Sequence, residues 1–308
     1  MSVSTHLRAR TGLLAVSGGA LLWGTTGVAV RIVHDRSGLA AVSIGWYRVA
    51  IAAIVVALVF RGAGLRAAAQ AVRRHPTRLL LTGAGFGAYQ ALYFVGVQFV
   101  GVSISTLVSL GIAPIALTAG AAVGRRRWPA ASSLTVLVCA ITGLALVALR
   151  PGSGAESPHP VLGVLASIAS GLGYAGITAL SRRMSDEDPL VLTGVTSAVG
   201  AVVLLPFAIA AGLALPTDGI ANGWLVYIGV VPTVVAYWLF YQGLRSTASE
   251  VTGVLTLLEP LAAAVLAAIV LHESLTGEAL AGGCLMLLAV GSLYLRKPSP
   301  DVGEVSPP

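Results

Sequence analysis

Residues 12–35 read GLLAVSGGALLWGTTGVAVRIVHD, and residues 163–186 read GVLASIASGLGYAGITALSRRMSD. Each stretch contains an apolar run long enough to cross the hydrocarbon core of a bilayer, which takes roughly 20 residues of helix. The two stretches also match at a constant offset of 151 positions. The matching pairs include Gly12 with Gly163, Ala15 with Ala166, Trp23 with Tyr174, Arg31 with Arg182 and Asp35 with Asp186. Together they predict a membrane protein that contains one unit twice.

The composition of the whole chain excludes a soluble protein. Of its 308 residues 56% are hydrophobic and only 10% are charged, with a mean hydropathy of +0.89. A soluble domain carries roughly 25% charged residues, because its surface must be hydrated on all sides. The net charge of +7 is therefore interpreted as a signal of membrane orientation, and nucleic acid is excluded as a partner. The lipid bilayer is the expected surroundings, in the cell membrane.

Ten apolar runs of membrane-spanning length follow one another along the chain. The predicted spans are 12–33, 40–60, 79–98, 101–123, 130–149, 160–180, 189–213, 223–242, 251–271 and 277–296. The first run is too long for the apolar core of a typical signal peptide, so it is interpreted as a retained helix. The tail of residues 298–308 is rich in Pro, Ser and acidic residues and is predicted to be disordered.

The basic residues indicate how these spans are oriented, because Lys and Arg are concentrated in cytoplasmic loops. With the N-terminus inside, 15 of the 19 basic residues lie in inside segments: Arg8, Arg10, Arg61, Arg66, Arg73, Arg74, Arg78, Arg125, Arg126, Arg127, Arg182, Arg183, Arg245, Arg296 and Lys297. Arg31, Arg36 and Arg150 lie in outside segments, and Arg48 lies within a span. Both termini are therefore predicted to be cytoplasmic.

Five spans lie on each side of the linker at residues 150–160. Because five is an odd number, the second unit must cross the membrane in the opposite sense to the first. The predicted fold is an all-α integral membrane protein of ten transmembrane helices in a five-plus-five inverted repeat. Its units are residues 12–150 and 160–297. Inverted repeats are typical of secondary transporters, since two opposed copies can expose a central site to each side in turn.

Short motifs at corresponding positions add a family resemblance. They are Leu22-Trp23-Gly24, Tyr47-Arg48, the small-residue helix that ends in Pro114, its counterpart Leu258-Glu259-Pro260, and His272-Glu273 before a Gly-rich last helix. In this arrangement the chain resembles the drug/metabolite transporter superfamily, specifically its EamA-domain members, over residues 12–297. The resemblance implies a ten-helix carrier of small solutes such as amino acids or related metabolites. One departure is that Gly124-Arg125-Arg126-Arg127 stands in the first unit where the family often has an acidic residue.

Two charged residues, Arg48 and Glu259, lie deep within predicted spans. A charge near the bilayer centre costs on the order of 3 kcal/mol, so such residues usually face a cavity or a partner. At 1.5 Å per residue the two depths differ by roughly 6 Å, within reach of two long side chains. One hypothesis is that they bind opposite ends of a zwitterionic solute, and a purely structural ion pair is the alternative. Glu259 is also the candidate for coupling to protons.

The surroundings of Glu259 suggest a polar helix face. Thr252, Thr256, Glu259 and Ala263 share the spacing of one side of a helix. Pro260 lacks a backbone N–H, so it is expected to break the helix and free a carbonyl group towards the cavity. Pro114 is the corresponding helix-breaking residue of the fourth span.

Aromatic residues in the middle of spans are candidates for the wall of a substrate site. Tyr89 and Tyr93 lie one turn apart on the third span, and Tyr237 occupies a similar position on the eighth. Trp23 and Tyr174 match between the first and sixth spans. Substrate contact and ordinary packing both remain open for them.

These features favour a secondary transporter that moves small metabolites, most simply by export. A drug or toxic-compound exporter and a nucleotide-sugar-type carrier are the alternatives within the same fold. An enzyme or a channel is disfavoured, because the five histidines form no paired metal motif and no nucleophile has a recognisable base near it in sequence. No cofactor and no metal are predicted, protons are a candidate coupling ion, and the oligomeric state is left open.

Overall fold

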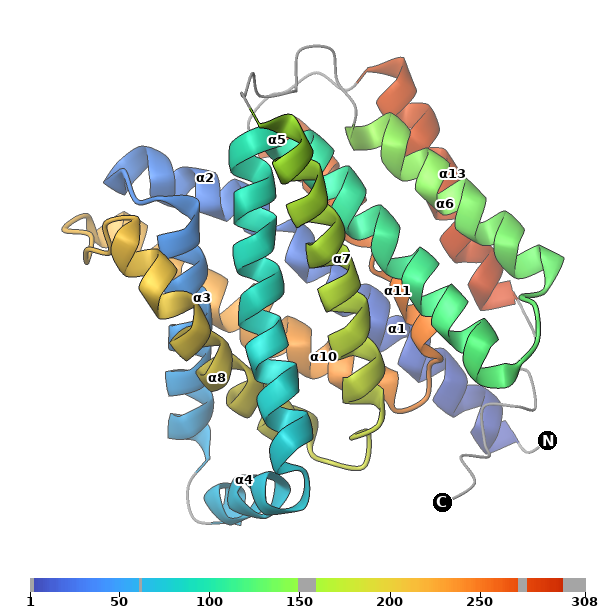
Figure 1. Ribbon diagram of the computed structural model, residues 1–308, viewed down its shortest axis with the longest axis horizontal. Coiled ribbons are helices and arrows are strands. Elements are labelled where there is room, and N and C mark those ends of the chain that lie inside the picture. The colour runs from blue at the N-terminus through green and yellow to red at the C-terminus, as the bar shows by residue number, and fades with distance from the viewer. Residues whose placement is uncertain (1–2, 61–62, 149–158, 271–275, 296–308) are drawn as a thin grey trace.

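The computed structural model describes residues 3–60, 63–148, 159–270 and 276–295, and every regular element there is a helix (Figure 1). The elements are α1 (Val3–Gly24), α2 (Thr26–Ser37), α3 (Ala41–Val59), α4 (Ala63–Arg74), α5 (Pro76–Arg125), α6 (Ala131–Ala148), α7 (Pro160–Arg182), α8 (Pro189–Ala210), α9 (Gly219–Gly229), η1 (Val230–Val235), α10 (Ala236–Leu244), α11 (Ser249–Leu255), α12 (Leu258–Val270) and α13 (Gly277–Leu295). Residues 150–158 of the predicted linker, the motif at His272-Glu273 and the predicted disordered tail at 298–308 lie outside the described residues.

Nine stretches of the described chain are helices long and apolar enough to cross a membrane. One of them, α5, has 50 residues and turns back at Gly101, whose φ of 80° and ψ of 165° are not helical (Figure 1). Glycine adopts positive φ readily because it has no Cβ. The two limbs of α5 correspond to the predicted spans 79–98 and 101–123, so each predicted span has its helical segment.

Three spans are interrupted in the middle. The first is divided at Thr25 between α1 and α2, and the ninth at Thr256 between α11 and α12. The eighth passes from α9 to α10 through the π-helical turn η1, which contains Pro232. Pro232 has no N–H that could donate to the carbonyl of Ile228. The hydroxyl group of Thr233 donates to that carbonyl instead, at 2.8 Å. Local repair of this kind allows a broken helix to remain inside a membrane protein.

The spans contact one another in a ring. Along it α1 packs on α10 and α12, α3 on α8 and α9, α8 on α5, α5 on α7, and α11 on α5. Helices α6 and α13 form a separate pair beside α12. Their backbones approach closely, since a Cβ placed on Gly143 would lie 2.6 Å from the carbonyl oxygen of Gly282. Such small-residue contacts are typical of helix pairs in lipid. The hydroxyls of Ser17 and Tyr294, 2.7 Å apart, link the first span to the last.

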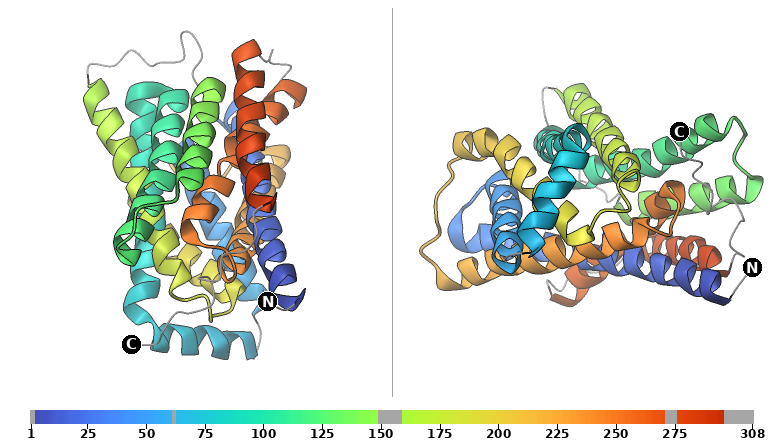
Figure 2. Two further views of the ribbon diagram at one scale, coloured as in Figure 1. Left: turned by 90° about the vertical axis from the view of Figure 1, so that its right-hand side faces the viewer. Right: turned by 90° about the horizontal axis from the view of Figure 1, so that it is seen from below.

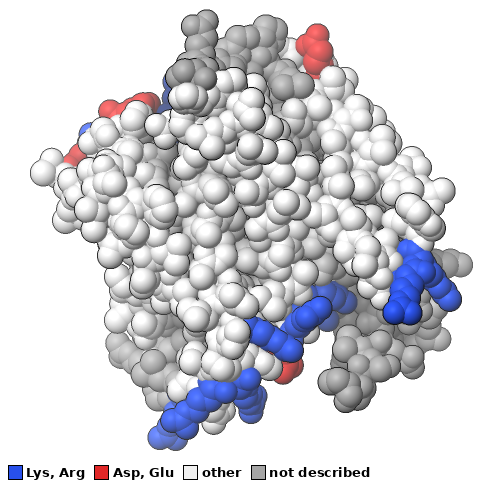
Figure 3. Space-filling model, viewed as in Figure 1, with Lys and Arg blue, Asp and Glu red and all other residues white. Residues whose placement is uncertain are grey.

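Helix α4 was not predicted from the sequence, where its residues were assigned to a loop. It lies across one end of the bundle, roughly perpendicular to the spans (Figures 1 and 2). Its sequence AGLRAAAQAVRR is strongly amphipathic, with Ala71 buried and Arg66, Arg73 and Arg74 exposed. On the face drawn in Figure 3 most Lys and Arg side chains lie towards this end of the molecule. We call it the basic end.

Candidate functional site

Arg48 and Glu259 lie in the interior of the bundle, on α3 and α12. They are close enough to interact electrostatically, but they do not form a direct ion pair. Instead the Nη2 atom of Arg48 donates to Oε1 of Gln90. The amide of Gln90 in turn donates to the carbonyl of Phe86 at 3.2 Å. Arg48 is thus oriented by a buried amide, which leaves the carboxylate of Glu259 outside this pairing.

Glu259 stands where two helices meet at close range. A Cβ on Gly24, at the end of α1, would lie 2.8 Å from the carbonyl oxygen of Glu259. Leu258 and Pro260 on either side of it are buried, whereas Glu259 itself is partly exposed. Contact with lipid would be costly for a carboxyl group at this depth in a span.

An aromatic cluster lies between helices α1, α5, α7 and α10. Trp23 packs on Tyr237 with ring centroids 4.8 Å apart and on Phe240 at 5.2 Å. Phe86 contacts Tyr237 at 5.0 Å, and Tyr89 contacts Tyr174 at 5.6 Å. We refer to Trp23, Phe86, Tyr89, Tyr174, Tyr237 and Phe240 as the aromatic layer. Of these six side chains, only that of Tyr89 is more than marginally exposed.

Three of the four tyrosines predicted as wall residues, Tyr89, Tyr93 and Tyr237, make hydrogen bonds to other hydroxyl groups. The hydroxyls of Tyr89 and Tyr237 lie 3.0 Å apart. Tyr93 is bound to Thr106 on the second limb of α5, at 2.9 Å. Arg48 lies near Tyr89 and Tyr237, and Glu259 lies near Tyr93 and Tyr174. The predicted site residues Trp23, Arg48, Tyr89, Tyr93, Tyr174, Tyr237, Thr256 and Glu259 are therefore gathered in one region.

The predicted polar face around Glu259 needs a correction. Thr252, Thr256 and Glu259 do not lie on one continuous helix, because the helix breaks at Thr256 and Leu257. The carbonyl of Thr256, four residues before Pro260, accepts the N–H of Glu259 at 3.0 Å and is not free. Pro260 has no N–H and cannot donate to the carbonyl of Thr256, four residues before it. The hydrogen bond from the N–H of Glu259, three residues after Thr256, takes its place. Thr256 is 2% exposed, and its hydroxyl donates to the carbonyl of Gly253 at 3.0 Å.

Pro114 contacts the broken span directly. The prediction that it breaks the fourth span is wrong, because α5 continues as a helix through Pro114 and departs from helical geometry at Gly101. Pro114 is buried, and a Cβ on Gly253 would lie 3.1 Å from its Cα. The fourth and the ninth span therefore pack together just beside the break at Thr256. The break and Pro114 place the turn that carries Glu259 against the first span.

Two polar atoms of the site are buried without a hydrogen-bond partner. They are Nε1 of Trp23 and Nε of Arg48. An unmet buried polar group costs about 1–3 kcal/mol, so these atoms are suited to bind an acceptor on a solute. Together with the carboxylate of Glu259 they offer donors and an acceptor within a largely aromatic enclosure. This combination can bind a small molecule that carries both charges and an apolar part.

Gln90, Phe86 and Phe240 were not named as site residues from the sequence. Gln90 carries no charge, and a lone amide in an apolar run has no periodic signal. The available hint for Gln90 was its position directly after Tyr89, a predicted wall residue. Phe86 and Phe240 could not be identified in this way, because a phenylalanine that faces the site has the same residue type as one that faces lipid.

A second polar group lies at the basic end. His75, Asp186 and Glu187 have potential ligand atoms within 4.8 Å of one another. The buried Glu187 is 3.6 Å from His75 and 3.7 Å from Arg74. Because Arg74 adds a positive charge at the same oxygen, ion pairing explains this group without a metal. It ties the end of α7 to the start of α5.

The chain is similar to known transporters. Residues 161–295 match the model of the EamA-like transporter family. Over 214 residues the chain is 29% identical to the uncharacterized transporter YwfM of Bacillus subtilis, covering 69% of this chain and 71% of the relative. An uncharacterized transporter of Haemophilus influenzae is 30% identical over 124 residues, which cover 39% of this chain and 72% of the relative.

Two further similarities extend over nearly the whole chain. The uncharacterized inner membrane transporter YicL of Salmonella typhimurium is 24% identical over 285 residues, covering 91% of this chain and 94% of the relative. A solved crystal structure superimposes with a TM-score of 0.76 at 19% identity, covering 96% of this chain and 98% of that one, which shows a shared fold. With the apolar helices described above, these similarities assign the chain to the cell membrane as a multi-pass protein.

Proposed function

The chain belongs to the EamA-like transporter family, and on this basis we propose that it is a secondary transporter that exports amino acids or closely related metabolites by alternating access. The observation that carries the proposal is the pair of opposite charges, Arg48 and Glu259. They lie close together inside the membrane, do not neutralise each other by direct contact, and are surrounded by aromatic rings.

A zwitterionic solute fits this arrangement. Its carboxylate would accept hydrogen bonds from Nε of Arg48 and Nε1 of Trp23, the donors that lack partners. Its ammonium group would bind the carboxylate of Glu259 and the faces of the neighbouring tyrosine rings, since aromatic faces attract cations. An apolar side chain of the solute would contact the aromatic layer. Each charge of the solute thereby replaces water with a protein partner, as a charge within the membrane requires.

Alternating access follows from the proposed inverted repeat of residues 12–150 and 160–297. Spans at matching positions run in opposite directions through the bundle, as the chain path in Figure 1 supports. The third and eighth spans meet at the hydroxyls of Tyr89 and Tyr237. Two opposed units that meet at a central site can rock about it. The basic end is the cytoplasmic side in this proposal, because Lys and Arg remain on that side.

Glu259 is the proposed coupling residue for protons. A carboxyl group that can alternate between a proton and the ammonium group of a solute exchanges one for the other in each cycle. Carboxyl groups act in this way in the proton relays of pumps and transporters. Drug export is a second candidate function, which the aromatic layer favours because large apolar cations bind such surfaces. A nucleotide-sugar carrier would need several cations at the site, and of the described arginines only Arg48 lies there.

The first experiment compares cells that express the protein, its Glu259→Gln variant, or neither, by untargeted metabolite profiling of cytosol and medium. Export predicts that one solute class accumulates in the medium only with the unaltered protein. The variant keeps the shape of the side chain but cannot carry a negative charge. If all three profiles agree while both proteins are present in the membrane, export of ordinary metabolites is contradicted, and drug efflux is tested next with cationic dyes.

A further inference from the structure

Arg182, the last residue of α7, is held at the basic end by backbone groups of a distant segment. Its Nη1 atom donates to the carbonyl of Leu244 at 3.1 Å and to the carbonyl of Thr247. Leu244 ends α10, and Thr247 lies in the turn before α11. The last carbonyls of a helix have no partner within it and carry a partial negative charge, so an arginine is a suitable cap for them.

This contact crosses the ring of spans. On their long faces α7 packs on α5, whereas α10 packs on α1. Arg182 therefore joins two helices whose main packing partners differ. Along α7 and α10 it lies beyond Tyr174 and Phe240 of the aromatic layer, at the ends of the two helices. Tyr174 and Phe240, on the same two helices, approach to 6.4 Å between ring centroids. At the same end Arg125 and Glu250 form an ion pair of 2.7 Å between α5 and α11.

Side chains close to the Arg182 contact are less exposed than the charged side chains of the candidate site. Phe240 in the aromatic layer is 3% exposed, and Tyr241 and Thr178, which lie between that layer and Arg182, are 3% and 1% exposed. Arg48, Tyr93 and Glu259 all keep partial exposure. The passage between the site and the basic end is thus filled with side chains, and the charged residues of the site are less enclosed.

We infer that Arg182 is the gate residue of the basic end: it keeps that end closed by binding the carbonyls of Leu244 and Thr247, and it must release them before a solute can pass between that end and the site. The inference rests on the proposed transport function. Arg182 touches neither Arg48 nor Glu259, so its role concerns which end is open and not the recognition of the solute. Both of these charge-assisted hydrogen bonds must break when the basic end opens, and they therefore favour the closed state.

The test uses a single reporter cysteine at Thr178, one turn from Arg182, in the full-length protein with Cys139 and Cys284 replaced by alanine. Membrane vesicles of both orientations are treated with a membrane-impermeant maleimide. Arg182→Gln is expected to raise the labelling rate about tenfold, and only in vesicles that expose the basic end. Arg183→Gln is the matched control, since Arg183 is the exposed neighbour with the same charge, and it should label as slowly as the parent.

Equal labelling of the Arg182→Gln and Arg183→Gln variants would overturn the inference. If Arg182→Gln does not reach the membrane, Arg182→Lys replaces it. Lysine keeps the charge but not the planar fork that reaches both carbonyls, so it should also label faster than the parent, and no increase would again contradict the gate. Because labelling needs no solute, a positive result stands even if metabolite profiling finds no export, and the two proposals fail separately.

Discussion

The hydroxyl groups of Tyr89 and Tyr237 lie 3.0 Å apart, although the two residues are 148 positions apart in the chain. They occupy similar positions in the two proposed units, on the third and the eighth span. Residues related by a two-fold axis can touch each other only near that axis. The contact therefore indicates where the proposed axis passes, and it lies inside the aromatic layer, beside Arg48 and its partner Gln90.

This tyrosine pair predicts a measurable coupling. We expect Tyr89→Phe and Tyr237→Phe each to lower the thermal stability of the purified protein, because each leaves one buried hydroxyl without its partner. The loss of stability in the double variant should be smaller than the sum of the two single losses. The difference should be about 0.6 kcal/mol, the average for hydrogen bonds between membrane helices. Fully additive losses would show that the hydroxyls do not bind each other.

Arg48 should be needed for its shape as well as its charge. Arg48→Lys keeps the charge but loses the Nε donor and the planar fork to Gln90. We expect it to weaken solute binding about tenfold or more, and Arg48→Gln to abolish measurable counterflow in proteoliposomes. The exchange of both charges, Arg48→Glu with Glu259→Arg, decides between binding and structure. Full transport by that double variant would mean that the residues form only a structural pair.

The Glu259→Gln variant is expected to lose proton coupling while it retains solute exchange. In Glu259→Gln vesicles, solute counterflow without a pH gradient is expected to persist at a reduced rate, whereas a pH gradient should no longer drive accumulation. The reason is that glutamine can still accept a hydrogen bond but cannot release a proton. A pH-sensitive dye inside the vesicles reports solute-driven proton movement. Accumulation that still follows the pH gradient in the variant would assign the coupling to another group.

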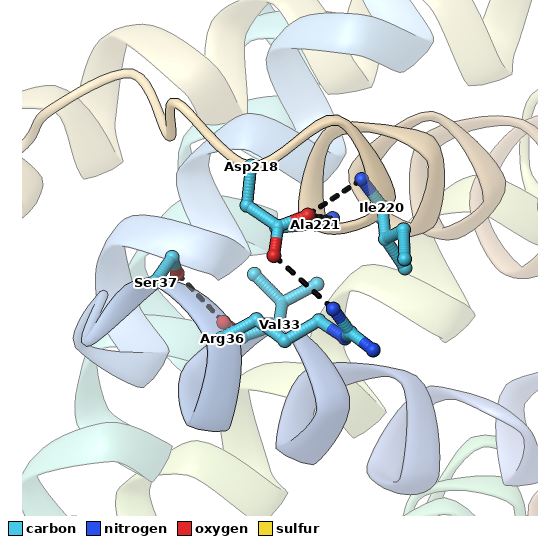
Figure 4. Close-up of polar contacts among 6 residues, drawn as sticks. All are labelled: Val33, Arg36, Ser37, Asp218, Ile220 and Ala221. Atoms are coloured by element: carbon cyan, nitrogen blue, oxygen red, sulfur yellow. Dashed lines mark hydrogen bonds and ion pairs between the residues drawn. The ribbon is translucent and has the colours of Figure 1, made fainter.

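The contact between Arg36 and Asp218 predicts a pH dependence at the end opposite α4. Asp218 caps α9 by accepting the N–H groups of Ile220 and Ala221, at 2.7 and 3.2 Å, and pairs with Arg36 at 3.2 Å (Figure 4). The backbone hydrogen bond from Ala221, then that from Ile220, and then Arg36 lower the pKa of Asp218 below its ordinary value of 3.8. The ionised form is the one that these partners stabilise.

Because the pKa of Asp218 is lowered on folding, its contribution to stability is complete above about pH 3.8 and is lost as the pH falls through the lowered value. Asp218→Asn, which retains a capping oxygen, should therefore melt at a lower temperature than the parent at pH 7. The difference should persist to about pH 4 and shrink below it. Asp218→Ala, which loses the cap as well, should melt lower still. A difference that is constant down to pH 2.5 would contradict this assignment.

The close approach of α6 and α13 makes Gly143 intolerant of a side chain. Gly143→Ala would place a Cβ 2.6 Å from the carbonyl oxygen of Gly282, and overpacking of this kind typically costs 1–3 kcal/mol. Gly120→Ala is the matched control, since nothing lies within 4 Å of its added Cβ. It should be neutral or slightly stabilising, because alanine is the better helix former. Equal melting temperatures for the two variants would contradict the packing of these helices.

Much of this fold could be predicted from the sequence because the solvent imposes it. A bilayer requires apolar runs of fixed length with all backbone groups satisfied, so the ten runs predicted the ten helical segments, including the division of α5 near Gly101. Helix α4 was missed because it lies across the end of the bundle. It has only 12 residues and carries three arginines, so it has no long apolar run.

The sequence by itself determined which residues had to lie in the membrane, and it singled out Arg48 and Glu259, because a charge in lipid is costly enough to be informative wherever it occurs. Only the tertiary structure decided their partners. It oriented Arg48 by Gln90, broke the ninth span at Thr256, joined Tyr89 to Tyr237 and bound Arg182 to Leu244 and Thr247. Those contacts depend on helix rotation and on backbone carbonyls, which every residue has, so no pattern of side chains along the chain distinguishes them in advance.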